Sequence, residues 1–166
     1  MNIRNLDEID LSYGHVIEEH INVSDQELIQ RLLYGDFKDL RYTGKTQKIV
    51  TKFESEQITE QIIRSALQFH IEKIKEWLRL RYDNRLVIQY NSLSKLGHGY
   101  AKYTDFRKNT YDMYSCIIIL ELGYNGSEFH ILTAYPTPNQ AIWQKIQNDR
   151  NVFWEKKKSM RAKKDK

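Results

Sequence analysis

The chain of 166 residues is 40% hydrophobic and carries a formal net charge of +4. This length fits a single domain with a sizeable hydrophobic core, and the lack of any long apolar run excludes a membrane-spanning helix. The N-terminus also lacks the apolar segment of a signal peptide. The only cysteine, Cys116, excludes an internal disulfide, and its apolar neighbours indicate a structural thiol in a buried strand.

The positive charge is concentrated at the C-terminus. From Glu155 onwards the sequence holds seven Lys or Arg against two acids, a net of +5, so the preceding residues carry about −1. The body is therefore not a broadly basic surface for nucleic acid. We expect one domain over residues 1–154. A basic, disordered tail over residues 155–166 should follow it and can hold a polyanion through salt-sensitive contacts.

Two short helical patterns with a break between them follow a polar N-terminal segment. The first pattern ends near residues 21–22. Ser24, followed three residues later by Glu27, forms a capping-box signature. This signature predicts that a second helix begins there and runs to about Tyr34.

His20 lies at the end of the first pattern and Arg31 near the end of the second. In one continuous helix, their spacing of eleven residues would hold them roughly 16 Å apart, which is too far to share one phosphate group. Two helices that meet at a corner can bring the two side chains closer. We therefore interpret the break as the feature that permits a shared site.

A strand and a long helix are predicted in the middle of the chain. Residues 35–45 have the composition of a loop, and residues 48–53 have strand character. Ser55 is typical of a helix N-cap, and the apolar spacing after it predicts one long helix to about Leu80. We interpret His70, inside this helix, as an ordinary helical residue.

Strand patterns dominate the sequence after residue 84. The predicted strands cover residues 86–90, 97–103, 113–122 and 128–135. Asn-Gly at residues 125–126 is a strong turn signal, and Pro136 and Pro138 should end the last strand. A terminal helix can follow over residues 139–150. Helices followed by antiparallel strands indicate an α+β domain.

The last predicted strand carries two hydroxyl side chains. Because alternate side chains of a strand share a face, Thr133 and Tyr135 should lie on one face, about 7 Å apart. Phe129 and Ile131 should lie on that same face, and His130 on the opposite one. Such a hydroxyl pair can bind a phosphate or give it a proton.

Several of these features occur together in an order that resembles a known family. In chain order they are His15-Val16-Ile17-Glu18-Glu19-His20, the capped helix that contains Arg31, the strand before a long helix ending in Trp77-Leu78, and Leu132-Thr133-Ala134-Tyr135-Pro136. Over roughly residues 10–138, the sequence resembles the bacterial RNase A-like toxin domains found at the C-termini of contact-dependent inhibition and other polymorphic toxins.

The resemblance implies a disulfide-free version of the pancreatic ribonuclease fold, with N-terminal helices packed on a curved antiparallel sheet. It also implies RNA cleavage without a metal ion or cofactor. The family's catalytic residues fall on His20, Arg31, Thr133 and Tyr135. The polar stretches at residues 35–45 and 104–112 and the basic tail depart from the family pattern.

These residue types suit cleavage of RNA by its own 2′-hydroxyl group. Histidine titrates near neutral pH, so His20 is a candidate for proton transfer. Arg31 can hold two phosphate oxygens, and Thr133 can donate a hydrogen bond to one. Tyr135 either orients the phosphate or supplies the proton of the leaving group. The products would be a 2′,3′-cyclic phosphate and a 5′-hydroxyl.

His15 and His98 are additional catalytic candidates. His15 lies five positions from His20, about 140° around a helix, so the two do not share a face. One of them can be catalytic and the other structural. His98 lies between two glycines, where the backbone can approach a ligand closely.

The resemblance also implies partners and a place of action. We expect an RNA substrate, with tRNA as one candidate. A cognate immunity protein should cover the cleft between the N-terminal helices and the strand at residues 129–136. We expect action in the cytoplasm of a target cell, either as part of a larger secreted toxin or as a free-standing protein.

Three other functions are kept as alternatives. A metal-dependent nuclease is disfavoured because the five histidines and one cysteine show no ligand spacing such as His-Glu-x-x-His. A barnase/colicin/RelE-like ribonuclease toxin would place its chemistry on the sheet, with His98 as a candidate and His20 dispensable. An RNA-binding or partner-binding module without activity would bind RNA regardless of His20.

Overall fold

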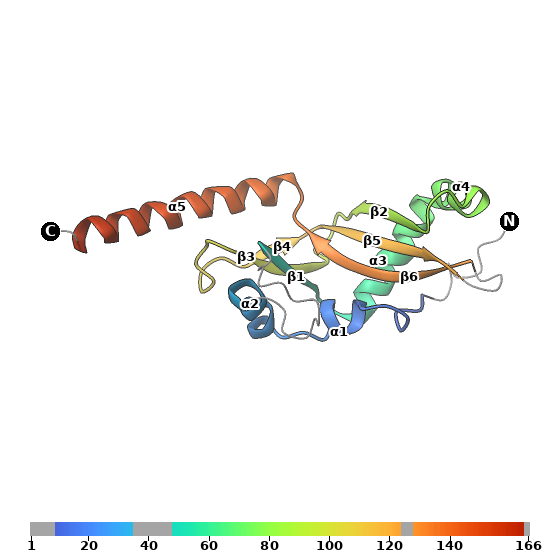
Figure 1. The fold of residues 1–166 in the computed structure, drawn as a ribbon, viewed down its shortest axis with the longest axis horizontal. Helices are drawn as coiled ribbons and strands as arrows, with labels where there is room; N and C mark the ends of the chain where they lie inside the picture. The colour runs from blue at the N-terminus through green and yellow to red at the C-terminus, as the bar shows by residue number, and fades with distance from the viewer. Residues whose placement is uncertain (1–8, 35–47, 124–127, 165–166) are drawn as a thin grey trace.

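Two antiparallel sheets form the centre of the molecule (Figure 1). The structure is a computed structural model that describes residues 9–34, 48–123 and 128–164. In this part of the chain, one three-stranded sheet has the order β1-β3-β4 and the other the order β2-β5-β6. The strands are β1 (Ile49–Phe53), β2 (Arg85–Asn91), β3 (Gly97–Ala101), β4 (Tyr111–Met113), β5 (Ser115–Leu122) and β6 (Phe129–Thr137).

The two sheets meet where β1 packs against β6. The Thr51 hydroxyl in β1 donates a 2.7 Å hydrogen bond to the carbonyl of Pro136 in β6. Figure 1 shows β5 and β6 as long, curved strands that carry the second sheet. This arrangement confirms the predicted α+β fold with helices on antiparallel strands.

Helices lie on both sides of the point where the sheets meet. They are α1 (Val16–His20), α2 (Asp25–Tyr34), α3 (Glu56–Phe69), α4 (Ile71–Leu80) and α5 (Gln140–Lys164). α1 packs against β1 and β6, α2 against β1 and β3, and α3 against β1 and β2. The largest fully buried side chains of the core include Phe53, Ile63, Trp77, Tyr111 and Ile118. None of the described helices is long and apolar enough to cross a membrane.

Two of the predicted helix starts are confirmed at serine residues. The Ser24 hydroxyl accepts a 3.1 Å hydrogen bond from the Glu27 amide at the start of α2. The Ser55 hydroxyl accepts one of 3.1 Å from the Ile58 amide at the start of α3. Each bond satisfies an amide that the first helical turn leaves without an internal partner.

The prediction of one long helix from Ser55 to Leu80 is wrong, because the helix is divided at His70 into α3 and α4. The His70 ring contacts the carbonyl of Gln89 in β2 through Nε2, at 2.9 Å, and α4 turns away from α3 beyond it (Figure 1). The helical periodicity holds no sign of this contact, because it joins residues from two different elements.

The predicted strand over residues 113–122 is also divided. Met113 in β4 pairs with Gly97 of the first sheet, whereas Ser115 in β5 pairs with Asn91 of the second sheet. The chain therefore changes sheets at Tyr114. A run of apolar residues indicates burial, but it does not indicate which sheet receives each part of the run.

A bulge in β6 changes which of its side chains share a face. Ile119 of β5 pairs with Thr133, and the next residue, Leu120, pairs with Ile131, so Leu132 is an extra residue on β6. An extra residue reverses the alternation of the side chains that follow it.

The predicted grouping of the β6 side chains is therefore wrong in part. Thr133 and Tyr135 share a face, as predicted, but Phe129 and Ile131 are buried on the opposite one. His130 lies on the same face as Thr133 and Tyr135, because the extra residue falls between them.

β6 also continues to Thr137, although Pro136 and Pro138 were expected to end it. β6 pairs with β5 alone in its sheet and is an edge strand. A residue without an amide hydrogen is tolerated on such a strand. The Pro136 carbonyl still contributes to the fold through its bond with Thr51.

The terminal helix is longer than predicted. We expected it to end near Arg150, with a disordered tail over residues 155–166, but α5 continues to Lys164 and projects from the body (Figure 1). Residues 151–164 contain neither glycine nor proline and are rich in lysine, which favours helix. The loop expected over residues 35–45 and the Asn-Gly turn lie outside the described residues.

Candidate active site

A cleft of about 770 Å³ lies between the N-terminal helices, β1 and β6. All four residues that the family resemblance singled out line it: His20, Arg31, Thr133 and Tyr135. The remaining polar or aromatic lining includes His15, Glu19, Lys48, Thr51, Arg85 and Trp143. The structure therefore brings together residues that are more than one hundred positions apart in the chain.

α1 reaches this cleft because its start is fixed directly on the bulge of β6. The His15 amide donates a 3.2 Å hydrogen bond to the Leu132 carbonyl. The chain approaches so closely that a Cβ atom on Gly14 would lie 1.8 Å from the same carbonyl oxygen. Only glycine fits this position without displacing the backbone.

The His20 side chain is 19% exposed and lies at the end of α1. Burial, followed by the nearby charge of Arg31, lowers the pKa of His20 from 6.5 to about 4, although a backbone hydrogen bond with Thr51 opposes the shift. Its buried Nδ1 has no hydrogen-bond partner among the described residues. The imidazole is thus neutral at neutral pH and can accept a proton.

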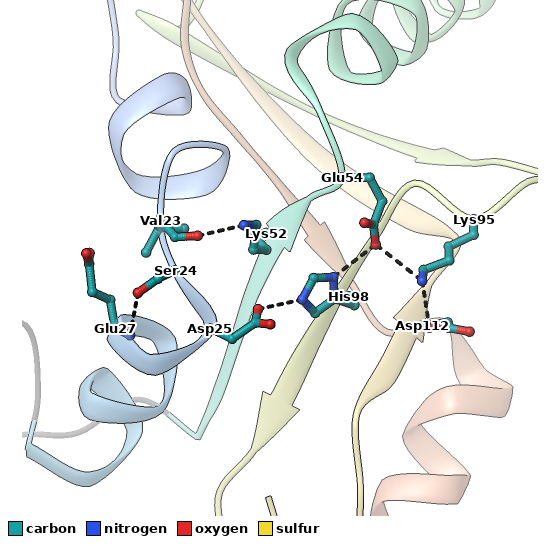
Figure 2. A network of polar contacts seen from close by, with 9 residues as sticks. All are labelled: Val23, Ser24, Asp25, Glu27, Lys52, Glu54, Lys95, His98 and Asp112. Carbon is teal, nitrogen blue, oxygen red and sulfur yellow. Dashed lines mark hydrogen bonds and ion pairs between the residues drawn. The ribbon is translucent and has the colours of Figure 1, made fainter. Parts of the chain in front are cut away.

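The corner between α1 and α2 brings Arg31 to His20. The Arg31 Nη1 atom donates a 3.0 Å hydrogen bond to the carbonyl of Glu19, the residue before His20. Lys52 in β1 supports the corner, since its Nζ donates a 2.6 Å bond to the Val23 carbonyl (Figure 2). The interpretation that a break between two helices unites His20 and Arg31 agrees with this geometry.

Thr133 and Tyr135 enter the cleft from β6, after the bulge. The Tyr135 ring lies against the His20 ring, with their centroids 5.7 Å apart. Thr133 and Tyr135 pair with Ile119 and Ile117 of β5, so an apolar strip of the sheet adjoins the two hydroxyl groups. The bulge therefore decides that the hydroxyls face the cleft and not the core.

The two additional histidine candidates have different positions. His15 is exposed and lines the cleft near His20. His98 does not line it, but lies between two carboxylates, with Nε2 2.7 Å from Asp25 Oδ1 and Nδ1 2.9 Å from Glu54 Oε1. Figure 2 shows how His98 thereby links the start of α2 to the end of β1, while Lys95 extends the network from Glu54.

Sequence reasoning did not identify two cations of the cleft, Lys48 and Arg85. Arg85 forms a 3.2 Å ion pair with Glu121, its neighbour across the sheet. Each of these residues looks like an ordinary strand-flanking cation in the sequence. Both reach one cleft only in the folded structure, where β1 packs against β6 and β2 belongs to the same sheet as β6.

The single cysteine of the sequence does not line the cleft. Cys116 is buried in β5, as predicted, and burial raises the pKa of its thiol to about 12. Within residues 9–34, 48–123 and 128–164, no group of three or more His, Cys, Asp or Glu side chains is arranged to hold a metal ion.

Comparison with known proteins agrees with the fold. A crystal structure of a CdiA-CT/CdiI complex from Y. kristensenii 33638 contains a chain with a similar fold, at a TM-score of 0.61 and 23% sequence identity. The match covers 75% of this chain and 100% of that chain. No curated protein matches the chain.

The family comparison is more specific. The model of the bacterial CdiA-CT RNase A domain matches residues 14–136, a segment that begins at the glycine before α1 and ends within β6. This match confirms the resemblance to RNase A-like toxin domains and favours it over the barnase/colicin/RelE-like alternative. The chain therefore belongs to the family of bacterial CdiA-CT RNase A domains, which are ribonucleases.

Proposed function

We propose that this chain is a toxic endoribonuclease that cleaves RNA without a metal ion, and that His20, Arg31, Thr133 and Tyr135 are its catalytic residues. The observation that carries the proposal is the convergence of these four side chains in one cleft. The reaction joins the 2′-oxygen to phosphorus and breaks the bond from phosphorus to the 5′-oxygen. It leaves a 2′,3′-cyclic phosphate and a 5′-hydroxyl end.

His20 takes the proton from the 2′-hydroxyl group in this mechanism. Its lowered pKa keeps the ring neutral before RNA binds, so a lone pair is available for the proton. The negative phosphate of the substrate favours the protonated ring once the proton has moved. The neighbouring Arg31 then balances the charge of the phosphate itself.

Arg31 and Thr133 stabilise the phosphorus centre as its negative charge grows. The Arg31 guanidinium keeps donors beyond the one that binds the Glu19 carbonyl, and a guanidinium suits two phosphate oxygens at once. The Thr133 hydroxyl donates to one of the same non-bridging oxygens. Tyr135 either protonates the 5′-oxygen as it leaves or orients the phosphate, in which case water supplies that proton.

A test of this mechanism measures cleavage of total RNA and tRNA in excess EDTA. The wild type should cleave and leave cyclic-phosphate ends. Folded His20→Ala should lose cleavage, and Tyr135→Phe should show whether the tyrosine hydroxyl takes part. Failure of the folded wild type to cleave any RNA would refute the proposed activity and favour an RNA-binding module. Full cleavage by His20→Ala would refute the proposed site.

We also infer that a cognate immunity protein covers the cleft between α1, α2 and β6. The support is that the similar Y. kristensenii structure is a CdiA-CT/CdiI complex. A domain of this family would be delivered into a target cell as the C-terminal part of a larger toxin and would act on RNA in the cytoplasm. Full ribonuclease activity in a stoichiometric mixture with the product of the adjacent gene would contradict the inhibitory partner.

The basic half of α5 supplies additional affinity for RNA in this proposal. Lys156, Lys157 and Lys158 are exposed, and they lie beyond the segment that matches the family. Cations along a helix attract phosphate groups without reading their sequence. The helix would therefore increase the affinity for long RNA more than for a dinucleotide.

A further inference from the structure

A second hollow of about 460 Å³ adjoins the cleft. Pro138 and Trp143, before and within the first turn of α5, line both spaces. From there the second hollow extends to Gln89 and Asn91 in β2. The proposed mechanism uses none of these four residues.

The second sheet fixes the distance between this hollow and the catalytic hydroxyls. Tyr135 in β6 pairs with Ile117 in β5, and Ile117 pairs with Gln89 in β2, so all three side chains share one face. Adjacent strands are about 4.8 Å apart, so Gln89 lies roughly 10 Å from Tyr135. One nucleotide can span this distance between its phosphate and the far edge of its base.

Trp143 presents an aromatic ring at the boundary between the two spaces, and 41% of it is exposed. Its backbone is fixed by the start of α5. The Trp143 amide donates a 2.9 Å hydrogen bond to the Asn139 carbonyl, and the Asn139 side chain accepts one of 2.9 Å from the Ile142 amide. A capped helix start fixes the backbone from which the ring projects, and an exposed aromatic ring at this position suits stacking on a base.

Two amide side chains line the same hollow as this ring. Asn91 Oδ1 accepts a 2.8 Å hydrogen bond from the Ser115 hydroxyl, so the other end of this side chain, Nδ2, carries its two donors. Gln89 is exposed beside it on the same strand face. Amide groups both donate to and accept from the edges of nucleobases.

We propose that the second hollow is a nucleobase subsite, in which Trp143 stacks on a base next to the scissile phosphate while Asn91 and Gln89 contact its edge. This inference deepens the proposed ribonuclease function and rests on it. The base must come from an unpaired nucleotide, because pairing and stacking occupy the edge and faces of a base in a duplex. The RNA is therefore single-stranded where it is cut.

The first experiment measures cleavage of a series of dinucleotides by variants at two tryptophans. Trp143→Ala should lower kcat/KM roughly 5- to 150-fold through KM, as expected for the loss of one stacked base, whereas Trp143→Phe should keep most of it. Trp154→Ala is the matched control, because Trp154 is 45% exposed on the same helix and packs on Tyr103 at 5.2 Å, away from both spaces. Equal effects of Trp143→Ala and Trp154→Ala would overturn the subsite.

The second experiment measures base binding without cleavage. The sequence has three tryptophans, and Trp77 is fully buried. In a His20→Ala, Trp154→Phe variant, nucleoside monophosphates should therefore quench the emission of Trp143 saturably. Asn91→Leu should weaken this binding and change the order of the four bases. An absence of quenching, or the same quenching after Trp143→Phe, would overturn the proposal.

The two experiments separate this inference from the proposed function. His20-dependent cleavage with no effect of Trp143→Ala would refute the subsite alone. If the wild type cleaves no RNA, but nucleoside monophosphates still quench Trp143 saturably in the His20→Ala, Trp154→Phe variant, the ribonuclease function is refuted and the base-binding site is retained.

Discussion

At the scale of single residues, the two histidines of the cleft differ in how far they are removed from water. His20 is largely buried beside Arg31 and Tyr135, whereas His15 is exposed at the rim. The buried imidazole is neutral at neutral pH and can accept a proton in the proposed mechanism, in which a bound phosphate would raise its pKa towards neutrality. An exposed histidine has no such environment, although its charge helps to lower the pKa of His20.

This difference predicts unequal effects of two alanine substitutions. His20→Ala should lower kcat/KM for RNA by about 10²–10⁴-fold, and His15→Ala by less than about tenfold. Steady-state cleavage of a dinucleotide, together with circular dichroism of both variants, makes the comparison. A larger loss in folded His15→Ala than in folded His20→Ala would assign the base to His15.

The burial of His20 also predicts a dependence of stability on pH. Because the pKa of His20 is lowered from 6.5 to about 4 in the folded state, the unfolded chain binds the proton more tightly. The contribution of His20 to the free energy of unfolding should therefore be fully present above pH 6.5. It should be lost as the pH falls towards 4, which lowers the free energy of unfolding by up to about 3 kcal/mol.

Urea unfolding of the wild type and of His20→Asn, between about pH 7.5 and about pH 4.5, measures this contribution. The variant lacks the titrating group, so its stability should decrease less than that of the wild type over this range. Parallel curves for the two proteins would show that His20 is not linked to folding.

At the scale of elements, the site depends on a five-residue helix that is too short to be stable by itself. α1 is held by the bond from the His15 amide to the Leu132 carbonyl and by burial of Val16. The β6 bulge provides the carbonyl and also directs Thr133 towards the cleft. One irregularity in one strand therefore positions both halves of the site.

Gly14→Ala should move α1 away from β6 and so separate His20 from Thr133 and Tyr135. The added Cβ would clash with the Leu132 carbonyl, so α1 must move, at a cost of about 1–3 kcal/mol in stability. A displacement near 1 Å should lower kcat/KM by roughly 100-fold. Thermal unfolding and dinucleotide cleavage measure the two effects, and Glu18→Ala, an exposed change in the same helix, is the control. Wild-type cleavage by Gly14→Ala would contradict the role of this contact.

At the scale of the whole molecule, the cleft and most of the net positive charge lie in different parts of the chain. The cleft belongs to the segment that matches the family, and α5 extends from it as a basic arm (Figure 1). Because the body is nearly neutral, the proposed function assigns the attraction of RNA to the cations of the cleft and to this arm. We expect long RNA to contact both, and a dinucleotide to contact only the cleft.

The salt dependence of RNA binding should show the contact between RNA and the basic half of α5. Replacing Lys156, Lys157 and Lys158 by glutamine should reduce the slope of log affinity against log salt by about 2, and leave dinucleotide cleavage unchanged. Fluorescence anisotropy of a labelled RNA with the His20→Ala protein measures the slope. Replacement of the same three residues by arginine is the control that keeps the charge. An unchanged slope in the glutamine variant would exclude these lysines from RNA binding.

The sequence by itself determined the features that depend on neighbours along the chain. Ser24 and Ser55 cap their helices as predicted, because a cap is formed with residues three positions away. Local patterns predicted where most of the strands lie, and the order of the motifs indicated the RNase A-like family. The four residues suggested by that order all line one cleft, and their catalytic roles stay predictions.

The tertiary structure decided what depends on contacts between distant elements. The predicted long helix is divided at His70, where the His70 ring contacts the Gln89 carbonyl. The register of β6 with β5 decides which β6 side chains share a face. The burial of His20 requires α1 to lie on β6 and β1. Local patterns carry no record of these contacts, because their free energy arises only when the chain has folded.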